Sequence, residues 1–125
     1  MMTTSAGDSR RVLVVDDNAD AAELLVDLLL SWGHRAIHVF DGGGALTAAA
    51  EFLPEVVLLD IGLPGLDGYE VARRLVQLPA LRDTRLVAMT GHCTDDDRER
   101  ARGAGFGDHI AKPFDLEKLA RVLRS

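Results

Sequence analysis

The sequence predicts an α/β domain built on a doubly wound parallel sheet. Two observations predict this fold. Short apolar runs alternate along the chain with longer stretches of helical periodicity, and this pair of patterns repeats five times. Short runs rich in Val, Ile and Leu are typical of strands that are buried on both faces of a parallel sheet. Their alternation with helices indicates a doubly wound sheet rather than a bundle or a sandwich.

The predicted strands are the five short apolar runs. They span residues 12–15, 36–40, 56–59, 86–89 and, with a weaker pattern, 109–111. Glycine and proline punctuate the joins between these runs and the helical stretches, where they favour turns.

The predicted helices occupy the longer stretches that follow each strand, at residues 18–32, 45–52, 69–78, 96–104 and 115–123. The first carries apolar side chains at the spacing of one helical face, from Ala21 to Trp32. The second is expected to begin only at Ala45, because the three glycines before it disfavour helix.

Right-handed crossovers between parallel strands limit the possible topologies. We expect the flavodoxin-like (βα)5 arrangement with strand order 2-1-3-4-5, which places the first and third strands side by side. The first helix then runs back along the sheet, so Trp32 is expected near the edge opposite the carboxyl ends of the strands. Residues 1–10 are polar and are expected to form a flexible N-terminal tail before a single domain at residues 11–125.

Composition restricts the class of protein and its partners. The chain has 125 residues, of which 47% are apolar and 27% charged, and this suits one globular domain with a single core. Its net charge is −6 and it has no basic stripe, so neither a nucleic acid nor an anionic membrane is the expected partner. No run approaches the roughly 20 apolar residues of a membrane span. The single cysteine, Cys93, excludes an internal disulfide and fits a cytoplasmic location.

Polar side chains follow four of the predicted strands at the point where each strand ends. Asp16 and Asp17 follow the first strand, and Asp60 follows the third. Thr90 follows the fourth strand and Lys112 the fifth. Because ligands of open parallel sheets bind beyond the carboxyl ends of the strands, we expect these side chains to share one site.

The residue types in this group suit phosphoryl transfer with Mg²⁺. Neighbouring carboxylates repel one another unless a cation neutralises them, and Mg²⁺ prefers oxygen ligands. One carboxylate can act as a nucleophile and form an acyl phosphate. Lys112 can hold a phosphoryl oxygen as a point charge, and the Thr90 hydroxyl can donate to another oxygen.

Each residue alone has a simpler interpretation. Asp17 can be only the N-cap of the first helix, Lys112 a solvated lysine and Thr90 a turn residue. The agreement of four strand ends favours a functional site, provided that the fold brings them together.

Four motifs surround these strand ends. They are VLVVDDN at 12–18, VVLLDIGLPGLDGYE at 56–70, AMTG at 88–91 and AKPF at 111–114. Together they resemble the receiver domains of response regulators in two-component signalling, over about residues 11 to 124. The wording around Asp60 and at Gly105-Phe106 is most similar to receivers of hybrid histidine kinases.

The resemblance implies a role for each acid. Asp60 would accept a phosphoryl group from a phosphohistidine of a histidine kinase or a histidine phosphotransfer protein. Asp17, Asp60 and the backbone carbonyl of Gly62 would bind Mg²⁺, with Asp16 acting through water.

The resemblance also implies roles for residues around the acids. Thr90 and Lys112 would contact the phosphoryl group, and the small Gly91 would leave the phosphate pocket open. The bond before Pro113 would be cis, which proline makes accessible. The output would pass through the face of the fourth helix, fifth strand and fifth helix, to a downstream protein or a second copy of the chain.

One position departs from the family pattern. Three residues before the lysine, many receivers carry Tyr or Phe as a rotating signal aromatic, whereas this chain has His109. We regard His109 as a candidate switch, because a shift of the Thr90 hydroxyl toward a phosphoryl oxygen would open space beside it. The alternative is a solvated edge-strand histidine with no role in switching.

Two other functions fit parts of the pattern. A Mg²⁺-dependent phosphohydrolase would need extra segments to cover a small substrate, and the chain has almost nothing beyond its predicted helices and strands. A pseudo-receiver that only binds partners would lack an acid or the lysine, and all are present. Because no DNA-binding module follows residue 125, direct control of transcription is not expected.

Overall fold

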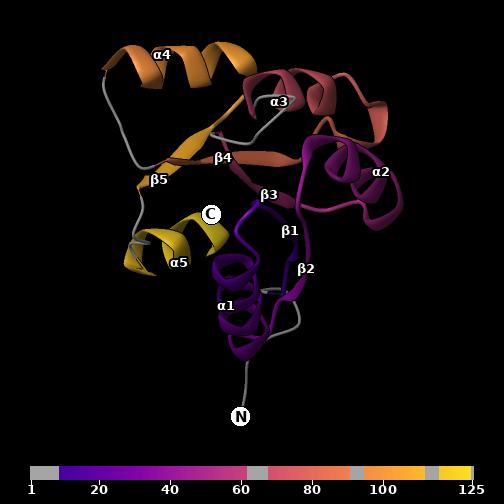
Figure 1. Cartoon of the computed structure of the whole chain (residues 1–125), viewed down its shortest axis with the longest axis vertical. Coiled ribbons are helices and arrows are strands. Elements are labelled where there is room, and N and C mark those ends of the chain that lie inside the picture. The colour runs from indigo at the N-terminus through magenta and orange to yellow at the C-terminus, as the bar shows by residue number, and fades with distance from the viewer. Residues whose placement is uncertain (1–8, 62–67, 91–94, 112–115, 125) are drawn as a thin grey trace.

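Five parallel strands form the centre of the fold (Figure 1). A computed structural model describes residues 9–61, 68–90, 95–111 and 116–124. The strands are β1 (Arg11–Val15), β2 (Arg35–Val39), β3 (Val56–Asp60), β4 (Arg85–Thr90) and β5 (Asp108–Ala111). Their order is β2-β1-β3-β4-β5, so the predicted flavodoxin-like topology is confirmed.

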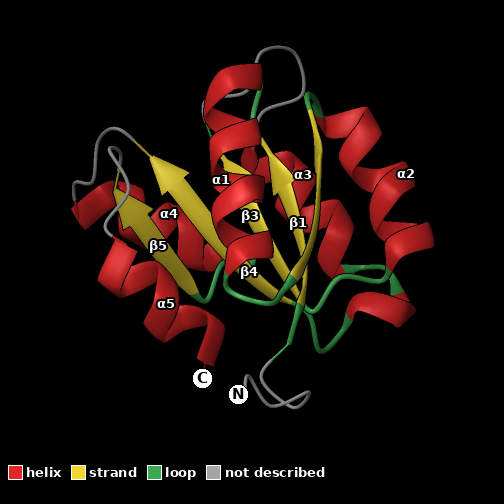
Figure 2. Ribbon diagram, turned by 90° about the horizontal axis from the view of Figure 1, so that it is seen from below, coloured by secondary structure: helices red, strands yellow, loops and turns green. Residues whose placement is uncertain are grey.

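Helices cover both faces of this sheet (Figure 2). One face packs against α1 (Ala19–Ser31) and α5 (Leu116–Arg124). The other packs against α2 (Gly42–Phe52), α3 (Gly68–Val76) and α4 (Asp95–Ala104). A short 3₁₀ turn, Pro79–Leu81, follows α3. None of the described helices is both long and apolar enough to cross a membrane.

The core divides into two apolar layers because side chains alternate along each strand. In β1, Leu13 and Val15 belong to the layer under α2, α3 and α4, whereas Val12 and Val14 belong to the layer under α1 and α5. All four side chains are fully buried. The central strands therefore show the solid apolar runs that the sequence analysis used to identify them.

Strand β2 departs from the prediction that every strand is buried on both faces. It pairs only with β1, and Ile37 is 37% exposed. Phe40, expected within the strand, lies just beyond it and is 49% exposed. The prediction is wrong here because β2 lies at the edge of the sheet, where the flanking helices cover the two faces less completely than over the central strands.

Helix α2 begins at Gly42, three residues earlier than predicted. The Asp41 side chain caps it by accepting a hydrogen bond from the Gly44 N–H at 2.6 Å. A good N-cap contributes about 1 kcal/mol, which offsets much of what a helical glycine costs. The prediction from glycine propensity alone therefore placed the start of this helix too late in the sequence.

The ends of α1 correct one interpretation and confirm another. Asn18, not Asp17, is the N-cap, and its side chain accepts a hydrogen bond from the Ala21 N–H at 3.1 Å. The alternative in which Asp17 serves only as this cap is therefore wrong. Trp32 is the C-cap and packs, half-buried, against the core layer under α1 and α5.

Arginines hold together the amino-terminal edge of the sheet. The Arg10 guanidinium pairs with Glu55 at 3.2 Å and donates from Nε to the Leu123 carbonyl at 3.1 Å. Arg85 donates to the Val122 carbonyl at 2.6 Å. Both carbonyls lie in the last turn of α5, where carbonyl groups lack partners within the helix. The sheet edge therefore fixes the end of α5.

Candidate functional site

The carboxyl-terminal edge of the sheet brings three acids together. Asp16 and Asp17 follow β1, and Asp60 ends β3. Carboxylate oxygens of the three lie within 4.8 Å of one another. Because β1 and β3 are neighbours in the sheet, the strand order alone accounts for this meeting.

Local hydrogen bonds determine how Asp16 lies in this group. Its N–H donates to the Val39 carbonyl at 3.1 Å, continuing the pairing of β1 with β2. Its carboxylate accepts a hydrogen bond from the Asn18 N–H at 3.0 Å. Asp16 is 1% exposed, whereas Asp60 is half-buried and Asp17 is exposed. Asp16 thus orders the turn before α1, and the other two acids are accessible from outside.

The donor set of the three acids fits a hard divalent cation. Three carboxylates supply only oxygen ligands, which Mg²⁺ prefers. Within the described ranges, no histidine or cysteine belongs to the group, so it offers no ligand that would favour a softer metal. The predicted Gly62 carbonyl ligand lies outside the described residues.

Thr90 ends β4, next to the strand that carries Asp60. It is 9% exposed and pairs in the sheet with Ala111, which precedes Lys112 in the sequence. Thr90 therefore lies at the same edge as the acids. The other predicted residues of the phosphate pocket, Gly91, Lys112 and Pro113, lie outside the described part of the chain.

Gly68 has a role that the sequence analysis missed. A Cβ atom at this position would lie 2.4 Å from the Ile61 Cα and 3.0 Å from the Asp60 carbonyl oxygen. Only glycine allows the first turn of α3 to approach the end of β3 this closely. The sequence shows a glycine at a join, but the close approach of residues 61 and 68 depends on tertiary structure.

His109 lies on β5 beside the strand that ends in Thr90, as predicted. The two side chains line one small cavity of about 10 Å³, together with Ile61, Ala88 and residues of α4. Partial burial lowers the pKa of His109 from 6.5, and the positive charges of Lys118 and Arg98 lower it further, against the opposing effect of Asp108. The neutral imidazole is therefore favoured next to Thr90.

The family model of the response regulator receiver domain matches residues 12–124. An uncharacterized 14.6 kDa protein of Leptolyngbya boryana is 31% identical over 113 residues, which cover 90% of this chain and 86% of that protein. The DNA-binding response regulator MtrA of Mycolicibacterium paratuberculosis is 37% identical over 93% of this chain. The chain spans only 50% of the length of MtrA.

Solved structures agree with these sequence relationships. The receiver domain of the sensor histidine kinase PA1611 from Pseudomonas aeruginosa is 33% identical, with a TM-score of 0.83. The match covers 92% of this chain and 94% of that one. That structure has a magnesium ion coordinated in its active site cleft.

Proposed function

Because the chain belongs to the response regulator receiver domain family, we propose that it accepts a phosphoryl group on Asp60 and uses the added charge as a switch. The observation that carries this proposal is the meeting of Asp16, Asp17 and Asp60 within 4.8 Å at one edge of the sheet. We assign the receiver domain to residues 11–125, preceded by a tail at residues 1–10, of which the last residue, Arg10, is fixed to the sheet edge through Glu55 and Leu123.

The proposed reaction is a transfer between two side chains. An oxygen of Asp60 attacks the phosphorus of a phosphohistidine, so an O–P bond forms as the P–N bond breaks. The imidazole leaves with a proton, and Asp60 becomes an acyl phosphate. Phosphoryl transfer requires mainly positioning and charge neutralisation. Asp60 is half-buried at the sheet edge, so its carboxylate is held in position and is still accessible to a donor.

Mg²⁺ would be held by Asp17, Asp60 and the Gly62 carbonyl, with Asp16 acting through water. When bound, it would neutralise negative charge on the carboxylates and on the phosphoryl oxygens. Thr90 would donate its hydroxyl to one phosphoryl oxygen, and Lys112 would pair with another. Gly91 would leave room for the group, and we retain the expectation of a cis bond before Pro113.

Receiver domains interact with histidine kinases or histidine phosphotransfer proteins, and we propose a donor of this class in the cytoplasm. The chemistry of the domain would be limited to phosphorylation and dephosphorylation of its own Asp60. We propose that the output leaves through α4, β5 and α5, to a downstream protein or to a second copy.

His109 is the candidate that would connect Thr90 to this face. The two side chains line one cavity, so a movement of Thr90 would change the space beside the imidazole. Beryllofluoride, a mimic of the acyl phosphate, should therefore shift the His109 resonances in an NMR titration. A ring that stays still, or His109→Ala with unchanged partner binding, would show that the signal leaves elsewhere.

Intact-mass analysis tests the phosphorylation directly. After incubation with phosphoramidate and Mg²⁺, the protein should gain one phosphoryl group, and Asp60→Asn should gain none. Asp27→Asn, an exposed acid of α1, is the matched control and should be labelled normally. Normal labelling of Asp60→Asn would refute the proposal, whereas turnover of small phosphate esters would favour the phosphohydrolase alternative.

A further inference from the structure

The two edge strands of the sheet differ in how they are protected. β5 lies at one edge and β2 at the other (Figure 1). An edge strand exposes N–H and C=O groups that can pair with another strand, and natural proteins block this pairing with very short strands, charged side chains or bulges. β5 carries such protection, whereas β2 does not.

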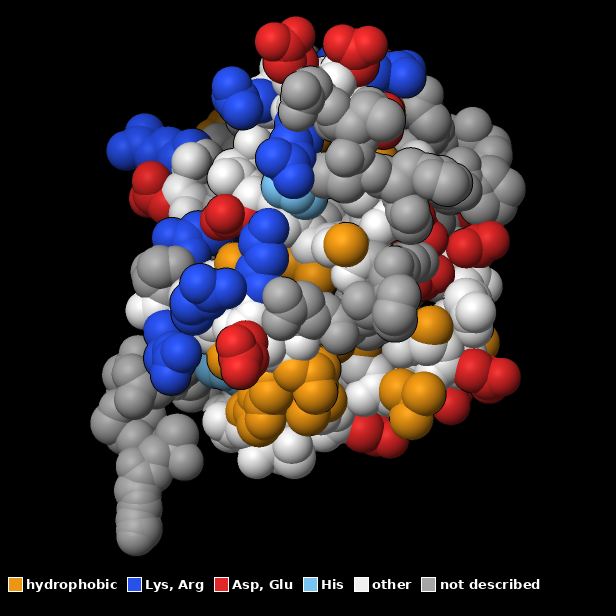
Figure 3. Space-filling view, turned by 90° about the vertical axis from the view of Figure 1, so that its left-hand side faces the viewer, with side chains coloured by type: hydrophobic (Ala, Val, Ile, Leu, Met, Phe, Trp, Pro, Cys, Tyr) orange, Lys and Arg blue, Asp and Glu red, His pale blue; other side chains and the backbone are white. Residues whose placement is uncertain are grey.

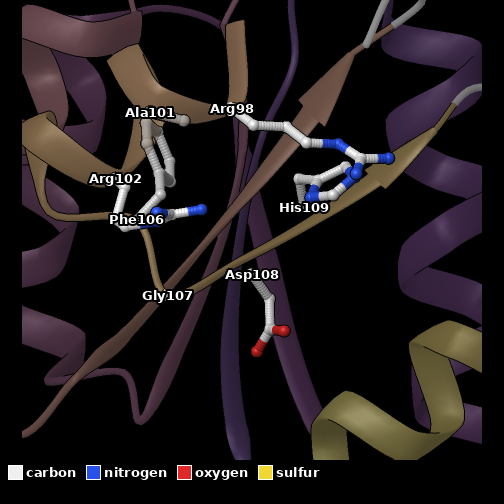
Figure 4. Close-up of a pocket in the computed structure, with 7 residues that line it drawn as sticks. All are labelled: Arg98, Ala101, Arg102, Phe106, Gly107, Asp108 and His109. Carbon is white, nitrogen blue, oxygen red and sulfur yellow. The ribbon is translucent and has the colours of Figure 1, made fainter. Parts of the chain in front are cut away.

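β5 is short and has charged side chains on both of its faces. It has four residues and begins with Asp108. In Figure 4, Asp108 and His109 extend from opposite sides of this strand, and Arg98 reaches over the His109 ring. Figure 3 faces the β5 side of the molecule and shows Lys and Arg side chains gathered there. A second strand that approached this edge would therefore meet charge on both faces.

β2 lacks these protective features. Its five residues pair with β1 without interruption, so no bulge bends the strand away from a neighbour. Arg35, at its start, is its only Lys, Arg, Asp or Glu. Ile37 is 37% exposed, and Phe40, just beyond the strand, is 49% exposed. Among the described residues, no strand lies beside β2 on its outer side.

The hydrogen bonds between β1 and β2 show which residues of β2 face outward. The Arg35 N–H donates to the carbonyl just before β1 at 2.9 Å, and the Val39 carbonyl accepts from the N–H just after β1 at 3.1 Å. Because successive residues of a strand direct these groups alternately to its two sides, Ala36 and His38 direct theirs away from β1. The outer side of β2 therefore presents two donors and two acceptors, spaced symmetrically about Ile37.

We propose that β2 pairs antiparallel with β2 of a second copy of the chain, about a twofold axis at Ile37. In this register Ala36 exchanges both of its hydrogen bonds with His38 of the second copy, and His38 does the same with Ala36. Ile37 then faces itself at the non-hydrogen-bonded position, where opposite side chains approach most closely. The contact is self-complementary, as a twofold interface requires.

The neighbouring registers use the backbone of β2 less fully. A shift toward the start of the strand brings in His34, whose N–H already donates to the Leu29 carbonyl at 3.0 Å. A shift in the other direction brings in Phe40, which lies beyond the strand. The register centred on Ile37 is therefore the one that pairs both outward-facing residues within the strand.

Charge is also complementary in this register. Arg35 lies opposite Val39 of the second copy and diagonal to its Asp41, whose backbone is extended. Diagonal neighbours on paired strands lie about 7–8 Å apart, which is within reach of a long side chain. The twofold axis makes this contact twice. An unrelated extended peptide would have to supply the matching acid itself, so a second copy is the favoured occupant.

The contact is small, so we expect a reversible dimer. Two paired strands of this length bury less surface than the roughly 1,200 Å² of a small stable interface, and each copy has a net charge of −6. Sedimentation equilibrium of the wild type should give a dissociation constant of about 10⁻⁵ to 10⁻³ M. As the concentration rises, the amide resonances of Ala36 and His38 should shift. A protein that remains monomeric, or shifts confined to β5, would overturn the proposal.

Position 37 gives the sharpest test because it faces itself across the proposed axis. Ile37→Lys and Ile37→Glu should each weaken dimerisation roughly tenfold, since each places two like charges opposite one another. An equimolar mixture of these variants should associate roughly fivefold more tightly than either alone, because opposite charges then meet.

Ile37→Gln is the matched control. It removes the apolar contact without adding charge, so its association should gain nothing from mixing with either charged variant. If the Lys and Glu variants associate no better together than apart, position 37 does not face itself and the proposal is overturned.

Proline tests the backbone pairing. Edge strands tolerate proline where the N–H faces outward, so His38→Pro should fold, and circular dichroism checks this. The variant lacks the donor to Ala36 of the second copy and should dimerise at least roughly tenfold more weakly. His38→Thr keeps the N–H, suits a strand and should stay within about threefold of the wild type. A folded His38→Pro variant that dimerises normally would refute the pairing, and if it does not fold, the charge mixture decides.

Phosphorylation separates this inference from the proposed function. Ile37→Lys leaves the acid cluster intact and should still gain one phosphoryl group. Asp60→Asn leaves β2 intact and should dimerise like the wild type. A protein that is labelled on Asp60 but stays monomeric would refute the β2 contact alone. A protein that dimerises through β2 but cannot be labelled would refute the proposed function alone.

Discussion

The two ends of the parallel sheet use charge in opposite ways. At the amino-terminal edge, arginines are matched with acids and carbonyl groups, as in the Arg10–Glu55 pair and the bond from Arg85 to the Val122 carbonyl. At the carboxyl-terminal edge, three acids lie within 4.8 Å of one another. One edge connects strands to α5, and the other concentrates like charge.

The difference separates residues that stabilise the fold from residues that prepare it to bind. Matched charges at the end of a helix favour the folded state. Gathered acids repel one another, and such local conflicts are expected at functional sites. The comparison predicts that substitutions at the two edges will change stability in opposite directions.

Arg85→Ala should give the largest loss of stability. It removes a charged donor from the Val122 carbonyl at the end of α5, and we expect the free energy of unfolding to fall by about 2 kcal/mol. Urea denaturation measures this change. Arg82→Ala, an exposed arginine just after the 3₁₀ turn, is the control and should stay within about 0.5 kcal/mol of the wild type. If the two variants are equally stable, the amino-terminal edge does not stabilise the fold in the way described above.

Asp17→Asn should act in the opposite direction. It removes one of three neighbouring negative charges, so without divalent cations the variant should be more stable by about 0.5 to 1 kcal/mol. Added Mg²⁺ should raise the melting temperature of the wild type more than that of the variant. A ligand stabilises the folded state in proportion to how tightly it binds, and the variant should bind Mg²⁺ more weakly. Calorimetric titration should show weaker Mg²⁺ binding by the variant.

The control for this pair of effects is Asp20→Asn. Asp20 lies in the first turn of α1, where a negative charge favours the helix, so its loss should destabilise slightly and leave Mg²⁺ binding unchanged. If Asp17→Asn loses stability, or keeps the full Mg²⁺ response, the three acids do not form the electrostatic group described above.

The sequence predicted the acid cluster better than the start of α2 or the contact between β3 and α3. Asp16, Asp17 and Asp60 could be placed together because each follows a buried apolar run, and parallel strands end at a common edge. The start of α2 was misplaced because the Asp41 cap outweighed the low helical propensity of Gly42 and its neighbours. The role of Gly68 was missed because a contact between the ends of β3 and α3 leaves no trace in local periodicity.

Titration of His109 gives a smaller test, on β5. NMR should give a pKa below 6.5, and Arg98→Gln or Lys118→Gln should raise it, because each removes a positive charge that lowers it. A lowered pKa means that the unfolded chain takes up this proton first. The contribution of His109 to the free energy of unfolding is therefore full above pH 6.5. It is lost as the pH falls from 6.5 toward the pKa of His109 in the folded protein. A pKa at or above 6.5 would contradict the combined effect of burial and these positive charges on His109.

The fluorescence of Trp32 should distinguish the amino-terminal edge of the sheet from the carboxyl-terminal edge. We expect it to give the smallest effect of these predictions. It caps the end of α1, about 20 Å along the helix axis from its start beside Asp16 and Asp17. It lines a cavity with His34, Ala120 and Arg124, next to the turn of α5 that Arg85 holds.

Mg²⁺ should therefore leave the Trp32 emission unchanged, whereas Arg85→Ala should alter it in the absence of any ligand. Fluorescence titration of the wild type with Mg²⁺, beside spectra of Arg85→Ala and Arg82→Ala, measures both effects at once. Quenching by Mg²⁺ in the wild type would mean that the acid cluster and the end of α1 are coupled through the sheet. The two edges would then respond as one unit, and their opposite use of charge would no longer divide binding from stability.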